Sequence, residues 1–226
     1  MKYITKEKHY DTLFKNEKKA GLNDMGLMYS YAWDKDPKRL VFTLSRYKFV
    51  AKMFNNKNNV LEVGAADGWP SRIVAQSVKK LTISDFDPVF INYAKTKLNN
   101  KFKINFLIHD MIKRPTIYKY DGIYALDVLE HINRKNESKF LKNISKSLSF
   151  NGALIIGVPS LESQRYSPES SKKGHVNCKT AKELKVLLFR HFSNVFLFSM
   201  NDEVLHTGFE KMSHYHFCLC TGVKNK

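Results

Sequence analysis

The fold is decided by one stretch of the sequence, VLEVGAADGWP at residues 60–70. Its first four residues predict a buried strand, and the glycines that follow predict a turn into a helix that begins near Pro70. Gly64 lets the chain leave the strand sharply and Gly68 lets the backbone pass close to a ligand, because glycine has no Cβ atom. The arrangement points backbone N–H groups and a helix N-terminus at a nucleotide-like ligand.

The charge of this loop restricts the ligand. A dinucleotide-binding loop has the pattern G-x-G-x-x-G, and its helix end binds a pyrophosphate. Here the loop reads GAADG, and Asp67 would repel a pyrophosphate. The next apolar run ends at Asp85, where a carboxylate would bind ribose hydroxyls. The residues therefore predict a ligand with a ribose and a positive charge but no phosphate, and S-adenosylmethionine meets all three requirements.

Further motifs follow in a fixed order. They are LEVGAADG at 61–68, Asp85, the pair His109-Asp110, DGIYALDVLEHI at 121–132 and NGALIIGVPS at 151–160. In this order they resemble the motifs of class I S-adenosylmethionine-dependent methyltransferases, and the LEHI segment is similar to that of members that act on small molecules. The resemblance covers roughly residues 60–159. One departure is Ala66, where the family usually has glycine; a methyl group there is expected to require a negative φ.

The loop residues and the resemblance together give a set of expected cofactor contacts. The resemblance implies that Asp110 accepts the adenine amino group, that Met111 supplies a backbone donor, and that Arg46 contacts the methionine carboxylate. For Arg46 a solvated surface position is the alternative, and for Phe86, expected on the adenine face, a place in the core. The full expected set is Arg46, Glu62, Gly64, Ala65, Asp67, Gly68, Asp85, Phe86, Asp110, Met111, Leu126 and Asp127.

Strand-like and helix-like patterns alternate along the chain, which predicts an α/β fold with a Rossmann-like, doubly wound and mostly parallel sheet. Asp36-Pro37 and Asp87-Pro88 each predict a capped helix start, and residues 180–183, TAKE, predict a capping box that opens another helix. Two final strands are expected at 195–200 and 215–222, joined by residues 201–213. The resemblance implies that the last strand is antiparallel and that the sheet has seven strands.

The chain is expected to divide into an N-terminal helical cap or lid, residues 1–54, and a cofactor-binding domain, residues 55–226. Within the cap, residues 21–33 carry an apolar side chain at every second position, which predicts an extended segment. That segment either covers the edge of the core or closes over the active site. Residues 160–177 are rich in serine and lysine and are expected to form a mobile, substrate-facing loop.

Composition narrows the class of protein. The chain has 226 residues, a net charge of +17 and 43% hydrophobic residues, with no apolar run long enough for a membrane span. Its first ten residues lack the apolar stretch of a secretion signal. The three cysteines, Cys178, Cys218 and Cys220, lack zinc-type spacing and favour a reducing, cytoplasmic location. The positive charge fits biased composition or an acidic small acceptor better than nucleic acid, because no basic block is present.

Three histidines are candidate general bases. His131 follows the predicted fourth strand, His175 lies in the serine-rich segment, and His206 lies between the last two strands. Histidine can take a proton from an acceptor near neutral pH. For each, a structural hydrogen bond or a solvated position is the alternative. His214 and His216 would share a strand face with His206 nearby, but no metal is expected.

The sequence thus predicts a methyltransferase that modifies a hydroxyl or similar group of a small metabolite, for example a sugar-linked one. The fourth-strand motif lacks the N/D-P-P-Y/F tetrad of many enzymes that methylate amino groups of bases. Two alternatives remain at this point: an RNA or other polyanion methyltransferase, and a non-catalytic protein that binds the cofactor. The oligomeric state is not predicted.

Overall fold

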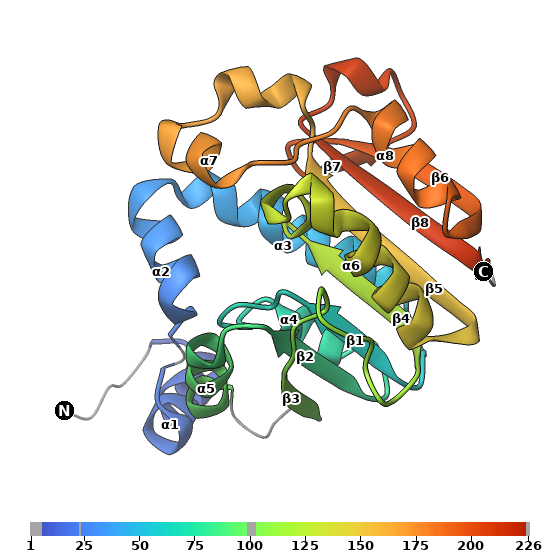
Figure 1. The fold of residues 1–226 in the computed structure, drawn as a ribbon. Coiled ribbons are helices and arrows are strands. Elements are labelled where there is room, and N and C mark those ends of the chain that lie inside the picture. The colour runs from blue at the N-terminus through green and yellow to red at the C-terminus, as the bar shows by residue number, and fades with distance from the viewer. Residues whose placement is uncertain (1–5, 23, 99–102, 225–226) are drawn as a thin grey trace.

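The computed structural model describes residues 6–22, 24–98 and 103–224, which form a single sheet with helices on both faces (Figure 1). The strand order is β3-β2-β1-β4-β5-β8-β6-β7. The strands are β1 (Val60–Val63), β2 (Leu81–Asp85), β3 (Ile104–Ile108), β4 (Tyr120–Leu126), β5 (Leu148–Pro159), β6 (Phe192–Asn201), β7 (Val204–His206) and β8 (Tyr215–Val223).

Strands β1 to β5 are parallel, whereas β8 runs antiparallel to both β5 and β6. The predicted doubly wound sheet and its antiparallel last strand are therefore confirmed. The predicted count of seven strands is wrong by one, because β7 pairs with β6 as a short hairpin inside the expected connection 201–213. A strand of three residues is too short to give a recognisable alternation of apolar and polar side chains in the sequence.

The helices are α1 (Asp11–Ala20), α2 (Gly26–Lys35), α3 (Pro37–Met53), α4 (Ser71–Ala75), α5 (Pro88–Lys97), α6 (Arg134–Ser147), α7 (Glu169–Gly174) and α8 (Ala181–Phe189), with four short 3-10 turns, η1 (Lys8–Tyr10), η2 (Leu129–His131), η3 (Glu162–Tyr166) and η4 (Glu210–Met212). In Figure 1, α6 and α8 cover one face of the sheet and α3 the other. Within the described part of the chain, no helix is both long enough and apolar enough to cross a membrane.

The two faces of the sheet are buried in two separate cores. In β5, Leu154 and Ile156 pack with α6 and α8, whereas Ala153 and Ile155 pack on the side of α3. This follows from the period of two in a strand, which sends neighbouring side chains to opposite faces. Because both faces are covered, the central strands are apolar almost throughout.

Local sequence signals fix several helix starts. The carboxylate of Asp87 accepts from Val89 N–H at 2.9 Å, and Thr180 and Glu183 form the two hydrogen bonds of a capping box at α8. Pro37 begins α3, but the side chain of Asp36 makes no capping hydrogen bond, so that part of the prediction is wrong.

Two segments differ from the expectation. Residues 21–33 are not extended, since most of them belong to α2, and residues 160–177 contain η3 and α7 rather than a loop alone. The N-terminal turn of α2 is held by Asp67, whose carboxylate accepts from Met28 N–H at 2.9 Å. That partner lies 39 residues away, so a local pattern could not indicate it.

The strand order reverses at the centre of the sheet. From β1 the chain winds outward through β2 and β3, and it then returns to place β4 on the other side of β1. The carboxyl ends of β1 and β4 therefore form the switch point at which open parallel sheets bind ligands. Figure 1 shows α2 and α7 on the side of the sheet toward which the parallel strands point.

Candidate active site

The glycine-bearing loop leaves β1 with three residues in the left-handed region. Their φ angles are 77° at Gly64, 47° at Ala66 and 66° at Gly68. A Cβ atom on Gly64 would collide with the side chain of Val128, and one on Gly68 would lie 2.6 Å from Ile83 Cδ1. Glycine is needed at both positions for its backbone conformation and for close packing.

Ala66 contradicts the expectation of a negative φ. Its backbone is left-handed, and its N–H donates to Asp85 Oδ2 at 3.0 Å. This hydrogen bond from the end of β2 holds a conformation that an alanine does not favour by itself. The loop and the second strand are thus tied together at the site.

Asp85 lies where the sequence places a ribose-binding carboxylate, at the end of β2. It is buried, and its other oxygen accepts from Asp87 N–H at 3.0 Å. An ionised carboxylate has about four acceptor positions, so two backbone donors leave capacity for ligand hydroxyls. The next residue, Phe86, is 72% exposed, which excludes the alternative of a core position for its ring.

Glu62 is buried beneath the loop. Its carboxylate accepts from the hydroxyls of Tyr47, Tyr124 and Ser71 at 2.7, 2.6 and 2.5 Å. Burial raises the pKa of Glu62, and the three hydroxyls act against that rise. The residue connects α3, β4 and α4 to the strand that carries the loop.

Asp67 is also buried, and it faces α2. In addition to Met28 N–H, its carboxylate accepts from Trp69 N–H at 3.2 Å. Tyr29 of α2 lies on the Trp69 ring, with 5.4 Å between the ring centroids. Tyr29 was not predicted as a site residue; its place in an aromatic segment is the only sequence signal for it.

Asp110 and Met111 follow β3, as predicted. Asp110 accepts from Ile112 N–H at 2.9 Å and lies 3.6 Å from the ammonium of Lys113. Met111 is buried, and its carbonyl accepts from the Asn143 amide at 2.8 Å. The turn at residues 110–111, which would face an adenine ring, is therefore held by hydrogen bonds to Ile112 and to Asn143.

The Arg46 side chain is mostly buried and hydrogen-bonded, in contrast to the alternative of a solvated surface position. Its Nη1 donates to both carboxylate oxygens of Asp127, at 3.1 and 2.9 Å, and its guanidinium carbon lies 3.8 Å from the ring centroid of Tyr215. Asp127 directly follows Leu126, which is buried at the end of β4, and has a φ of 55°. The pair joins α3 to the end of β4.

Two of the three predicted histidines lie together. His131 in η2 and His175 after α7 have ring centroids 5.2 Å apart. Burial, and next the charge of His131, lowers the pKa of His175. His206 is engaged elsewhere: its Nε2 lies 2.8 Å from Asn201 Oδ1, and its Nδ1 accepts from Gly208 N–H at 3.0 Å.

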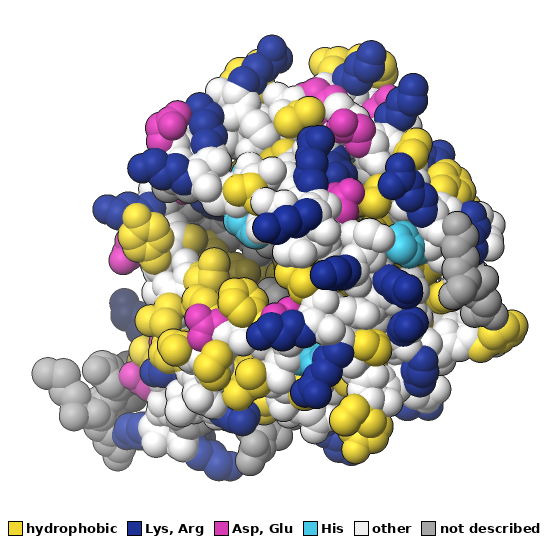
Figure 2. Space-filling model, in the orientation of Figure 1, with side chains coloured by type: hydrophobic (Ala, Val, Ile, Leu, Met, Phe, Trp, Pro, Cys, Tyr) yellow, Lys and Arg dark blue, Asp and Glu magenta, His cyan; other side chains and the backbone are white. Residues whose placement is uncertain are grey.

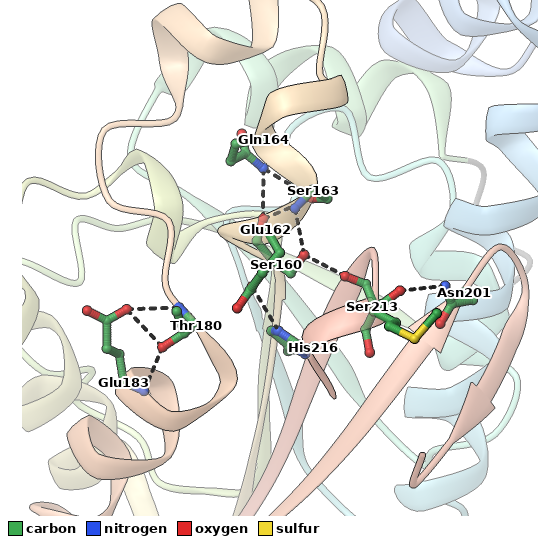
Figure 3. A network of polar contacts seen from close by, with 10 residues as sticks. Ser160, Glu162, Ser163, Gln164, Thr180, Glu183, Asn201, Ser213 and His216 are labelled. Carbon is green, nitrogen blue, oxygen red and sulfur yellow. Dashed lines mark hydrogen bonds and ion pairs between the residues drawn. The ribbon is translucent and has the colours of Figure 1, made fainter. Parts of the chain in front are cut away.

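A network of polar contacts supports the segment that carries His175 (Figure 3). The hydroxyl of Ser160 donates to the Ser213 carbonyl at 2.6 Å and accepts from Ser163 N–H at 3.0 Å. The Gln164 amide donates to the Ser160 carbonyl at 3.1 Å, and its oxygen lies 2.7 Å from His175 Nδ1. Gln164 was not predicted, because only its packing in space reveals its partner.

The surface is hollowed beside these elements. Figure 2 shows a hollow in this face, with hydrophobic side chains gathered beside it and a histidine at its rim. Lysines and arginines are scattered over this face, some of them beside the hollow, and they do not form one continuous patch around it. Pockets that bind small ligands are typically apolar with a few polar groups, and this face has that character.

The residues present fit S-adenosylmethionine. Asp85, Asp110 and Asp127 all follow carboxyl ends of the parallel strands, so acidic groups gather at one edge of a chain with a net charge of +17. A cationic sulfonium with ribose hydroxyls suits such a donor and acceptor set, whereas a pyrophosphate does not. Fold and site together define a Rossmann-like α/β protein that binds an adenosyl cofactor.

Comparison with known proteins identifies the family. A family model described as a methyltransferase domain matches residues 33–192. The chain therefore belongs to this family, and it is a class I S-adenosylmethionine-dependent methyltransferase with S-adenosylmethionine as its cofactor. No curated protein sequence matches it.

Solved structures share the fold at low sequence identity. The N-methyltransferase NodS of Bradyrhizobium japonicum WM9, in complex with S-adenosylhomocysteine, is 18% identical, with a TM-score of 0.61 over 97% of this chain and 100% of its own. The plantazolicin methyltransferase BpumL, also in complex with S-adenosylhomocysteine, is 16% identical, with a TM-score of 0.65 over 88% and 89%. The methyltransferase domain of bacterial CtHen1 is 16% identical, with a TM-score of 0.66 over 80% and 98%.

Proposed function

We propose that this methyltransferase modifies a hydroxyl or similar group of a small metabolite, for example a sugar-linked one. The observation that supports this most directly is the histidine pair beyond β4, His131 and His175, with ring centroids 5.2 Å apart. A hydroxyl acceptor must lose a proton during transfer, and histidine suits that role near neutral pH. His206 is not assigned this role, because both of its nitrogens have local partners.

The chain holds the two reactants in line. We assign the loop 64–68, Asp85, Phe86 and the 110–111 turn to the adenosyl group, and Asp127 to the methionine side. When bound, S-adenosylmethionine supplies a methyl group activated by its sulfonium. An acceptor hydroxyl held against that methyl group would take it in exchange for its proton, which His131 or His175 would accept, and S-adenosylhomocysteine would be released. Fixing this geometry can supply most of the acceleration.

Three of the expected cofactor contacts are better described as positioning residues. Glu62 is held by three interior hydroxyls, Asp67 is directed at α2, and Arg46 is paired with Asp127. We propose that Glu62 and Asp67 shape the loop and that Arg46 orients Asp127 at the end of β4. Ala65, which is buried in the core on the α3 side, supports the same loop.

The N-terminal residues 1–54 are proposed as a cap. Support comes from two contacts of α2 with the cofactor loop and its end. Met28 N–H donates to the Asp67 carboxylate, and the Tyr29 ring contacts the Trp69 ring. Several aromatic side chains of α2 are exposed, among them Tyr31 and Trp33. Such rings are suited to cover an acceptor.

We also propose a cytoplasmic location, supported by cysteines that are buried and unpaired.

A polyanion acceptor is the second candidate, and the net charge of +17 is the observation in its favour. The basic side chains are scattered over this face without one continuous patch around the hollow, which argues against it (Figure 2). An acidic small acceptor remains compatible with that charge.

Transfer of a tritiated methyl group tests the proposal. The chain is incubated with labelled S-adenosylmethionine and either hydroxyl-bearing metabolites, including acidic sugars, or total RNA. We expect label in the small-molecule fraction and a rate about 10²–10⁴-fold lower in His175→Gln, the range for loss of acid–base catalysis. Label in RNA that declines steeply between about 50 and 200 mM salt would instead support the polyanion candidate.

A further inference from the structure

The carboxylate of Glu130 is buried without a partner. Glu130 lies in η2 and is 1% exposed. Neither of its side-chain oxygens has a hydrogen-bond partner among the described residues. Buried polar groups in proteins are nearly always hydrogen-bonded, and an unpaired carboxylate is among the costliest groups to bury. Glu130 is therefore suited to a partner that the described residues do not provide.

Two histidines surround this carboxylate. One carboxylate oxygen of Glu130, one nitrogen of His131 and one nitrogen of His175 lie within 4.8 Å of one another. His131 is exposed and His175 is half-buried, so the group opens toward the surface on the histidine side. The two rings come from η2 and from the end of α7, which are distant in sequence.

Hydrogen bonds fix the proton on each imidazole. His131 Nδ1 lies 2.9 Å from the Gly174 carbonyl oxygen, which can only accept, so this nitrogen is the donor. His175 Nδ1 lies 2.7 Å from Gln164 Oε1. The amide of Gln164 cannot be reversed, because its nitrogen donates to the Ser160 carbonyl at 3.1 Å (Figure 3).

Both Nδ1 atoms therefore carry hydrogen, and both Nε2 atoms keep a free lone pair. In metal centres, a ligating histidine typically donates its other N–H to a carbonyl or carboxylate, which sets the tautomer and the ring orientation. His131 and His175 both have this second hydrogen bond. His206, in contrast, uses both nitrogens within its hairpin.

We propose that Glu130, His131 and His175 bind one divalent transition-metal cation. Two imidazole nitrogens and one carboxylate oxygen are a ligand set for Mn²⁺, Fe²⁺, Co²⁺ or Zn²⁺, whereas Mg²⁺ and Ca²⁺ prefer oxygen ligands. The cation would give the buried Glu130 carboxylate the partner it lacks. Asp127 is not part of the ligand set, because Arg46 engages both of its oxygens.

A catalytic role for this cation rests on the proposed function. Glu130 and His131 follow β4, which pairs with the strand that carries the cofactor loop, and His175 lies beside His131. A cation there would bind the acceptor hydroxyl and lower its pKa, so that the proton leaves to solvent before or during transfer. In that case the cation replaces histidine as the group that promotes loss of the acceptor proton, the histidines serve as its ligands, and the proposed acceptor and methyl transfer are unchanged. Binding of the cation itself depends on neither cofactor nor acceptor.

Titration with Co²⁺ alone tests the site. The full chain is freed of metal with a chelator, and visible absorption of Co²⁺ is followed without cofactor or acceptor. We expect one Co²⁺ per chain, with binding weakened at least about tenfold in Glu130→Gln and in His131→Gln, the lower end for changes around metal centres. His131 is exposed, so its variant is expected to fold, and circular dichroism checks both variants.

The matched control is His214→Gln. His214 lies 3.8 Å from the Asp202 carboxylate, but both side chains are exposed, so this pair represents an adventitious surface site. Unchanged binding in the control and loss in both site variants support the proposal. Absence of stoichiometric binding, or equal binding in wild type and Glu130→Gln, overturns it. The methyl-transfer assay on hydroxyl-bearing metabolites, run on the same protein, tests the proposed function separately, so the two proposals fail independently.

Discussion

Arg46 and Asp127 join the first long helix to the end of the fourth strand through one nitrogen, which donates to both carboxylate oxygens. The Arg46 side chain is 20% exposed and that of Asp127 is 38% exposed. Solvent therefore screens the pair in part, and its contribution to folding is smaller than that of a fully buried pair. Its position at the end of β4 is the basis for the proposal that it shapes the site.

A double-mutant cycle measures this pair. Arg46→Met and Asp127→Asn are combined, and urea unfolding gives the free energy of unfolding of each variant. We expect a coupling energy of about 1–2 kcal/mol, because the pair is part-buried and hydrogen-bonded twice. The exposed pair Lys97–Asp24, at 2.8 Å, is the control and should show no measurable coupling. Equal coupling in the two cycles would contradict a special role for Arg46.

Asp85→Ala should weaken binding of S-adenosylhomocysteine. Asp85 is proposed to bind the ribose and also holds Ala66 N–H, so its loss should affect both the ligand and the loop. We expect a loss of roughly 1–3 kcal/mol in binding free energy, the usual cost of an unpaired polar contact. Isothermal titration calorimetry measures it.

Asp121→Ala is the matched control for that variant. Asp121 also accepts from two backbone N–H groups, those of Asn58 and Asn59, both at 2.8 Å, but at the opposite end of β1. Its loss should reduce stability and leave cofactor affinity unchanged. If the two variants bind the cofactor equally well, the ribose lies elsewhere.

Ala66→Gly should stabilise the fold. A left-handed backbone costs a non-glycine residue about 1–2 kcal/mol, and glycine gives back part of this through the entropy of the unfolded chain. We expect the free energy of unfolding to rise by about 0.5–1 kcal/mol, as a shift of the urea midpoint without a change in slope. In Ala32→Gly, inside α2, the same exchange should lower stability by about 1 kcal/mol. Destabilisation by Ala66→Gly would show that the loop carries no strain.

His216 should make the fold sensitive to acid. It is fully buried, and burial lowers its pKa below the ordinary 6.5, although Glu162 at 4.0 Å and Glu210 act in the opposite direction. The unfolded chain therefore binds a proton at a higher pH than the folded chain does. The contribution of neutral His216 is complete above pH 6.5 and is lost as the pH falls through the lowered pKa.

Urea unfolding between pH 7.5 and about 5 tests this for wild type and His216→Leu. The wild-type curve should decline more steeply toward acid than the curve of the variant, and the difference between them isolates His216 from other titrating groups. His9→Leu, at an exposed position, is the control. Parallel curves for wild type and His216→Leu would contradict the prediction.

The sequence predicted those parts of the fold that depend on local signals. Asp87 and the Thr180–Glu183 capping box began helices where expected, because each side chain bonds to a backbone N–H within three residues. The central strands were equally clear, since both of their faces are buried and their side chains are apolar.

The failures have long-range causes. Residues 21–33 alternate like a strand, but no strand in the described part of the chain pairs with them. Asp67 supplies the first turn of α2 with an acceptor from 39 residues away. Ala66 was expected to avoid a positive φ, and Asp85 holds it there from the next strand. In both cases a carboxylate distant in sequence overrides the local preference.

The same distinction applies to the site. Asp85 and Asp110 could be predicted because they directly follow strands whose ends meet at one edge of the sheet. Gln164 and Tyr29 could not, since each acts through a partner brought near only by folding. The nearness of His131 and His175 likewise required the structure, because 43 residues separate the two rings along the chain.

The hydrogen bond between Asp67 and Met28 crosses the boundary of the family match. Residues 33–192 match the methyltransferase family, and α2 begins before that match. Asp67 thus lies within the matched residues, whereas its amide partner Met28 lies before them. Removal of α2 would leave the Asp67 carboxylate buried beneath the ligand loop without its partner Met28 N–H, so the helix and the aspartate depend on each other.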